Sequence, residues 1–163
     1  MGLLDSLGIT NRSQPRIYDA SAAAAKQRAS VLLVDDSPDN RLVLREFLKN
    51  APYDVEEAHN GAVAVAKVKL RDYDLIIMDL LMPEMDGFEA MRQIRRLEDS
   101  RPPEKRACVI TLTAWALKEA ELESYGCGAD IHMTKPIRKP QFLDVLGTEW
   151  ARILKQRARA ADC

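Results

Sequence analysis

Short apolar runs recur along this chain, and polar residues close each of them. The closing residues are Asp35 and Asp36 after VLLV, Asp79 after LIIM, Thr113 after VITL, and Lys135 with Pro136 after IHMT. Apolar runs of strand length that alternate with helix-length segments are typical of a parallel sheet. Because the carboxyl ends of parallel strands meet at one edge of the sheet, we expect these side chains to share a pocket there. Carboxylates, a hydroxyl and an ammonium group together suit a divalent cation and a phosphoryl group.

The alternation predicts five strands and five helices, and hence one α/β domain with helices on both faces of the sheet. Right-handed crossovers restrict the strand order to the doubly wound types. The strands are expected at residues 31–34, 53–58, 75–78, 108–112 and 131–133. The helices are expected to begin at Pro38, to follow Asn60-Gly61, to span 87–97 and 118–125, and to begin again at Pro140.

Apolar residues at helical spacing mark three of these helices. They are Leu44, Phe47 and Leu48 in the first, Val63, Ala66, Val68 and Leu70 in the second, and Phe142, Leu143, Leu146, Trp150, Ile153 and Leu154 in the last. The spacing in the last set continues through Gly147, so that helix is expected to extend well past this residue. We expect its basic end, KQRARA, to be solvated, with a contact surface as the alternative.

The composition indicates one soluble domain with tails. The chain has 163 residues, of which 47% are hydrophobic, and its net charge of -1 gives no bias toward nucleic acid. The three cysteines show neither the C-x-x-C spacing of redox motifs nor the spacing of zinc fingers, which favours a reducing cytoplasm. No apolar stretch is long enough to cross a bilayer. We expect an N-terminal arm and linker at 1–29, in which Leu3 and Leu4 pack on the body or on a neighbouring subunit, then the domain at 30–147. A C-terminal helical extension and tail should occupy 148–163.

Four segments together resemble the receiver domain of two-component response regulators: VLLVDDSPDNRLVL, DLIIMDLLMPEMDGFEAMRQIR, VITLTA and GADIHMTKP. The resemblance covers roughly residues 30–147, and the ordered combination is far more specific than any one motif. It implies a flavodoxin-like, doubly wound (βα)5 fold whose five parallel strands have the order 2-1-3-4-5. Because the chain has no glycine-rich phosphate-binding motif, side chains and a metal ion would have to hold a phosphoryl group.

The resemblance implies a phosphorylation site with a metal ion. Asp79 matches the residue that accepts a phosphoryl group from a phosphohistidine. Asp35, Asp36, Asp79 and the backbone carbonyl of Leu81 match the ligands of Mg²⁺, a hard cation that prefers oxygen ligands. Taken alone, Asp35 and Asp36 could merely cap the next helix, and Asp79 could be a turn residue.

Two further residues would contact the phosphoryl group. By the same resemblance, Lys135 pairs with its oxygens and Thr113 donates a hydrogen bond to it. Lys135-Pro136 resembles a cis peptide bond of the family. A surface lysine and a β-branched strand residue are the ordinary explanations of such residues. All the motifs in the family's order nevertheless favour one shared phosphorylation site.

The surroundings of the site depart from the family pattern at His132, where an aromatic residue usually changes rotamer on phosphorylation. A histidine there could add pH sensitivity, and a partly buried ring with a satisfied hydrogen bond is the alternative. The resemblance also groups Ala114 and Trp115 with the residues that modulate the switch. Leu81 and Trp115 are large and apolar, and we hypothesise that they shield the aspartyl phosphate and slow its hydrolysis.

The implied partners are a histidine kinase or histidine phosphotransfer protein and a downstream protein, which would contact the face of the fourth helix, fifth strand and fifth helix. We expect no enzyme activity beyond the chain's own phosphorylation and dephosphorylation. Because residues 148–163 are too few for a DNA-binding module, we expect no direct contact with nucleic acid. A homodimer formed through the terminal arms is a separate expectation.

Three alternatives stay open. They are an interaction module that does not depend on phosphorylation, a receiver excised from a hybrid histidine kinase, and a phosphohydrolase of the haloacid dehalogenase type. The last of these needs a second carboxylate two residues after the nucleophile, where this chain has Leu81.

Overall fold

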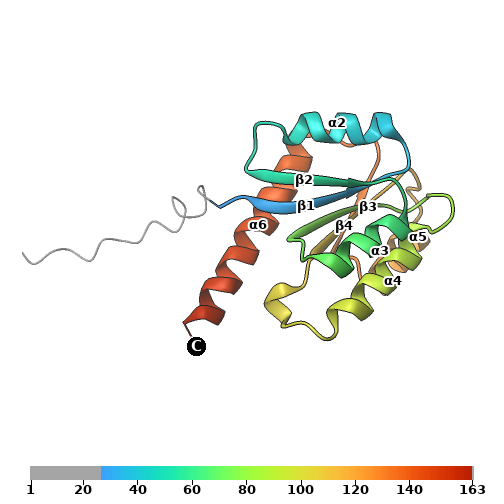
Figure 1. The fold of residues 1–163 in the computed structure, drawn as a ribbon. Coiled ribbons are helices and arrows are strands. Elements are labelled where there is room, and N and C mark those ends of the chain that lie inside the picture. Colours follow the sequence, from blue (N-terminus) through green and yellow to red (C-terminus); the bar gives the residue numbers. More distant parts are fainter. Residues whose placement is uncertain (1–26, 163) are drawn as a thin grey trace, which may run out of the picture.

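The computed structural model describes residues 27–162, which form a parallel sheet with helices on both faces (Figure 1). The strands are β1 (Ala29–Val34), β2 (Tyr53–Ala58), β3 (Leu75–Asp79), β4 (Cys108–Thr113) and β5 (Ile131–Thr134). The helices are α2 (Pro38–Leu48), α3 (Gly61–Leu70), α4 (Gly87–Glu98), α5 (Lys118–Gly126) and α6 (Lys139–Ala161), with a short 3-10 helix, η1 (Pro103–Lys105). The apolar arm expected near Leu3 lies outside the described residues.

The strand order is β2-β1-β3-β4-β5, and every pair is parallel, as predicted. The register decides which side chains meet at the carboxyl edge. Val34 of β1 lies opposite Met78 of β3, so the next residues, Asp35 and Asp79, are neighbours. In the same way, Thr113 ends β4 opposite Thr134 of β5, and Lys135 follows directly.

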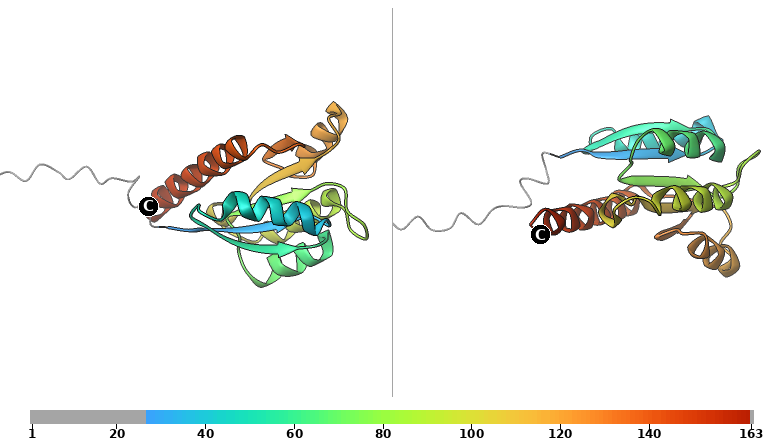
Figure 2. Two further views of the ribbon diagram at one scale, coloured as in Figure 1. Left: turned by 90° about the horizontal axis from the view of Figure 1, so that it is seen from above. Right: turned by 60° about the horizontal axis from the view of Figure 1, so that its bottom comes forward.

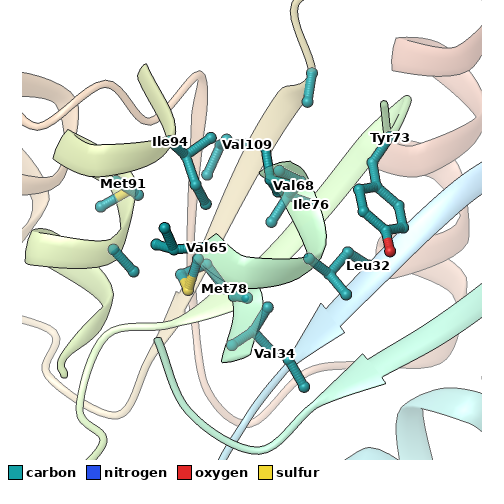
Figure 3. Packing of buried hydrophobic residues seen from close by; sticks show 14 of the residues in the cluster. Leu32, Val34, Val65, Val68, Tyr73, Ile76, Met78, Met91, Ile94 and Val109 are labelled. Atoms are coloured by element: carbon teal, nitrogen blue, oxygen red, sulfur yellow. The ribbon is translucent and has the colours of Figure 1, made fainter. Parts of the chain in front are cut away.

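Two apolar layers enclose the sheet. One layer packs strand residues such as Leu32, Ile76 and Val109 against α3 and α4, as Figure 3 shows. The other packs the alternate strand residues, among them Leu33 and Ile77, against α2 and α6. Because both faces of the inner strands are buried, their sequences are continuous apolar runs and not alternating ones.

Side-chain caps begin several of the helices, and the buried face of α3 agrees only partly with the sequence prediction. Ser37 caps α2 and Asp86 caps α4, each through a side chain that accepts a backbone N–H. In α3, Val68 is buried, but Leu70 is 86% exposed, while the buried face is completed by Ala64 and Val65. This helix is apolar almost all round, so its periodicity does not identify the face that packs.

The last helix, α6, continues to Ala161, and Figure 2 shows its end at the opposite side of the molecule from the carboxyl ends of the strands. Trp150 and Ile153 are buried in the same apolar layer as α2. The sequence analysis predicted a solvated basic end, but this prediction holds only in part. The Arg157 guanidinium bonds to the buried carboxylate of Asp74 and lies 5.8 Å from the centre of the Trp150 ring. None of the helices in residues 27–162 has both the length and the apolar character required to cross a bilayer.

We predict that Arg157→Gln lowers the free energy of unfolding by about 1–2 kcal/mol, because Asp74 then loses a charged hydrogen-bond donor. Arg159→Gln, at an exposed position two residues further along α6, should change it by less than about 0.5 kcal/mol. Urea unfolding of both variants measures the difference. Equal effects of the two substitutions would contradict a specific contact at Arg157.

Candidate functional site

Three carboxylates converge at the carboxyl edge of the sheet. One oxygen from each of Asp35, Asp36 and Asp79 lies within 4.8 Å of the others. Asp35 and Asp79 are buried, at 1% and 6% exposure, whereas Asp36 is exposed. Two buried carboxylates this close repel each other unless cations or hydrogen-bond donors stabilise them.

Asp35 is held by donors from the start of α2. Its Oδ1 accepts the backbone N–H of Ser37 at 2.9 Å, and the Asn40 side-chain nitrogen lies 3.2 Å from both carboxylate oxygens. The Lys135 ammonium approaches Oδ2 at 3.1 Å. The sequence prediction did not include Asn40. This residue lies in the first turn of α2, directly after the aspartates, and its side-chain amide therefore reaches Asp35.

Lys135 connects two of the carboxylates. Its Nζ lies 3.1 Å from Asp35 and 3.6 Å from Asp79, and the Lys135–Pro136 peptide bond is cis. The backbone N–H of Lys135 donates to the Thr113 carbonyl at 2.7 Å, which continues the β4–β5 pairing. A single ammonium group therefore pairs with both buried carboxylates. Because it lies beside Asp79, it could also pair with an anionic group bound to Asp79.

Burial raises the pKa of Asp79 from 3.8 to about 6. Lys135 opposes this shift, Asp35 adds to it, and a hydrogen bond from the Leu81 backbone lowers the pKa again. Without further cations the carboxyl group thus holds its proton up to an unusually high pH. A bound divalent cation would favour the ionised form, which is also the nucleophilic one.

The donor set fits Mg²⁺ on chemical grounds, because Mg²⁺ takes carboxylate, carbonyl and water oxygens. Leu81 lies in the loop that follows β3, and its side chain is 41% exposed. No hydrogen bond to the Leu81 carbonyl is present among residues 27–162, so this oxygen has a free lone pair for a ligand.

Thr113 ends β4, the strand that pairs with β3 at Asp79. Thr113 is fully buried, and its hydroxyl oxygen accepts the backbone N–H of Trp115 at 3.0 Å. The hydroxyl proton remains free to be donated. Ala114 is exposed, and Trp115 is 51% exposed.

His132 has polar contacts away from the carboxylates. Its Nδ1 lies 3.0 Å from the Thr111 hydroxyl and 3.1 Å from the Ser124 hydroxyl, which itself donates to the Glu121 carbonyl. With the Ser124 proton on the Glu121 carbonyl, the tautomer that bonds to Ser124 is the one with the proton on Nδ1. Burial lowers the pKa of His132, and Glu121 opposes the shift. The neutral ring is therefore favoured at physiological pH.

The pKa of Asp79 leads to a prediction for the protein without Mg²⁺. Between pH 4 and pH 6 the folded state keeps a proton that the unfolded chain has lost, so stability should fall as the pH rises through about this range. Asp79→Asn should then be more stable than wild type at pH 7.5, by about 1–3 kcal/mol, and equally stable near pH 4.

Thermal and urea unfolding at the two pH values, in chelator, measure this difference. Asp144→Asn, which removes an exposed carboxylate on α6, is the matched control and should show no such pH dependence. A destabilised Asp79→Asn at pH 7.5 would contradict the prediction.

Comparisons with known proteins agree with this geometry. The response regulator receiver domain family matches residues 31–147. The sensor protein EvgS of Escherichia coli K12 is 38% identical over 127 residues, which are 78% of this chain and 10% of EvgS. The chemotaxis protein CheY of Halobacterium salinarum is 38% identical over 116 residues, 71% of this chain and 92% of CheY. This chain thus spans about a tenth of the length of EvgS but nearly all of CheY.

A solved structure gives the same result. The receiver domain of the sensor histidine kinase PA1611 from Pseudomonas aeruginosa PAO1, with a magnesium ion coordinated in its active-site cleft, is 31% identical. It superposes with a TM-score of 0.68 over 76% of this chain and 98% of that one. The family match, the identity to CheY and the order of the sheet together show that this chain belongs to the response regulator receiver domains of two-component signal transduction.

Proposed function

We propose that Asp79 accepts a phosphoryl group from a phosphohistidine in an Mg²⁺-dependent reaction, and that the phosphorylated domain presents a changed protein-interaction surface. The convergence of Asp35, Asp36 and Asp79 beside the ammonium of Lys135 carries this proposal. A carboxylate attacks phosphorus poorly unless the charge on the surrounding oxygens is neutralised, and this site gathers the groups that do so.

Asp35, Asp36, Asp79 and the Leu81 carbonyl would hold the metal ion. When bound, Mg²⁺ supplies positive charge that neutralises the acceptor and the incoming phosphoryl oxygens. The magnesium ion in the PA1611 receiver structure supports this assignment, as does the cluster of carboxylate oxygens. Asp35 already accepts hydrogen bonds from several donors. The exposed carboxylate of Asp36 is therefore the one most accessible to an incoming metal ion.

Lys135 and Thr113 would respond to the phosphoryl group. Lys135 pairs with two carboxylates in the unphosphorylated protein, and a phosphoryl group on Asp79 offers its Nζ a more highly charged partner. Thr113 keeps a free hydroxyl proton for the same oxygens. The backbone of Trp115 is bonded to that hydroxyl, so a movement of Thr113 would be passed to the β4–α5 loop.

The response would reach partners through the face formed by α5, β5 and α6. Leu117 and Leu122 are each 60% exposed there, which suits a contact with another protein. Residues 30–147 would form the receiver unit, with the remainder of α6 as an extension. We infer a histidine kinase or histidine phosphotransfer protein as the donor, a cytoplasmic location and no enzymatic action on other substrates. A homodimer through the terminal segments is part of the same proposal.

Phosphorylation by acetyl phosphate tests the proposal. With Mg²⁺, wild type should gain the mass of one phosphoryl group, whereas Asp79→Asn should not, because the amide is not a nucleophile toward phosphorus. The exposed-site control Asp144→Asn should react like wild type. Multiple turnover of phosphate esters would indicate a phosphohydrolase, and no adduct with any donor would indicate an interaction module that does not use phosphorylation.

The hypothesis that Trp115 shields the aspartyl phosphate has its own test. Trp115→Ala should shorten the lifetime of the phosphorylated protein by about three- to tenfold, because water then reaches the acyl phosphate more easily. Leu117→Ala removes another exposed apolar side chain from the same loop and should leave the lifetime unchanged. Loss of the phosphoryl group after rapid removal of acetyl phosphate is followed by intact-protein mass. An unchanged or longer lifetime in Trp115→Ala would refute the hypothesis.

A further inference from the structure

The loop that joins β3 to α4, residues 80–86, carries Leu81 and is held at both ends. At one end the backbone N–H of Leu80 donates to the Leu112 carbonyl at 3.2 Å. At the other end the N–H of Gly87 donates to the Leu80 carbonyl at 3.0 Å, and a side chain at Gly87 would collide with the Asp79 backbone. The loop therefore closes tightly beside the phosphorylation site.

The middle of this loop has an unfavourable backbone conformation. Glu84 has a φ of +69°, and the N–H of Met85 donates to the Pro83 carbonyl at 2.9 Å across it. Such a three-residue turn around a residue that is not glycine costs conformational energy. Contacts from elsewhere must stabilise it.

Residues at the start of α3 supply these contacts. The Asn60 side chain, which is 5% exposed, donates through Nδ2 to the Glu84 carboxylate at 2.8 Å. The adjacent N–H of Gly61 donates to the Met85 carbonyl at 3.2 Å. A Cβ at Gly61 would lie 2.7 Å from that carbonyl oxygen, so the backbone of α3 approaches the turn as closely as glycine allows.

The amide of Asn60 has two functions at once. Its Oδ1 accepts the N–H of Val63 at 2.8 Å and caps α3, while its Nδ2 makes the bond to Glu84. Aspartate and serine cap helices about as well as asparagine. Aspartate, however, has no N–H to donate, and serine is too short to reach both groups. The cap alone does not explain an asparagine here.

We propose that Asn60 is a positioning residue of the phosphorylation site, which holds the Glu84 turn and thereby the Leu81 carbonyl where it can bind Mg²⁺. The inference rests on the proposed function, because the metal ligand at Leu81 is assigned there. Removing a group that bonds directly to a metal ligand typically weakens metal binding by about 10–100-fold. Asn60 acts on Leu81 through the intervening loop, so we expect an effect at the lower end of that range.

The test uses near-isosteric substitutions at pH 8, where carboxyl groups are ionised. Asn60→Asp keeps the cap on α3 but places a carboxylate against Glu84. Glu84→Gln alone keeps an oxygen that accepts from Asn60. In the double variant the direction of the hydrogen bond is reversed, since the new glutamine can donate to the new aspartate. Asn60→Ser removes the donor without adding charge.

Two quantities are measured for each protein: the Mg²⁺ dissociation constant by calorimetry, and the exchange rates of the Gly61 and Met85 amides without Mg²⁺. In Asn60→Asp and Asn60→Ser we expect the dissociation constant to rise about tenfold and both amides to exchange faster. Glu84→Gln and the double variant should stay within about twofold of wild type. Rescue in the double variant distinguishes the hydrogen bond from a general loss of stability.

Two results would overturn the inference. One is unchanged Mg²⁺ affinity in Asn60→Asp and Asn60→Ser, whether or not the two amides exchange faster, and the other is no rescue in the double variant. Each of these would leave the proposed function intact, provided that wild type binds Mg²⁺. A wild-type protein that does not bind Mg²⁺ would instead refute the proposed function, and this inference with it.

Discussion

The burial of two neighbouring carboxylates, Asp35 and Asp79, is the constraint on which the rest of this site depends. The register of β1 and β3 places them side by side, and burial raises the pKa of Asp79 to about 6. Lys135 lies between them, at 3.1 and 3.6 Å, and partly opposes this shift. A site that is short of positive charge favours cation binding, and with a cation bound it favours the ionised Asp79. The geometry that is predicted to lower the stability of the unmodified protein is thus the one on which the proposed phosphoryl transfer depends.

Much of the fold could be predicted because its signal is local. A strand buried on both faces must be apolar throughout, and the runs before Asp35, Asp79 and Thr113 identify such strands directly. The face that α3 buries could not be predicted, since a helix apolar on every side has no marked face. The contact between Arg157 and Asp74 was also missed, because it joins residues 83 positions apart through packing that no local pattern records.

The residues at the sheet edge were predictable as a set, because parallel strands bring their ends together whatever the loops do. The residues that bond to them and hold their surroundings could not be predicted. Asn40 and Asn60 reach their partners only through the geometry of the local turns, and the hydroxyls beside His132 come from two separate elements, β4 and α5. The ring of His132, at the position where the family resemblance predicts an aromatic residue, lies within hydrogen-bond distance of Ser124 and so makes a polar contact between β5 and α5.

Chemical trapping of the phosphorylated residue tests the central claim most directly. The protein is phosphorylated by a phosphohistidine-carrying phosphotransfer protein with Mg²⁺ and then treated with borohydride, which reduces an aspartyl phosphate to homoserine. Peptide mass spectrometry locates the product. The account predicts homoserine at position 79 and at no other aspartate, and none when Mg²⁺ is chelated. Homoserine at Asp35 or Asp36, or phosphoryl transfer that proceeds equally well in chelator, would contradict it.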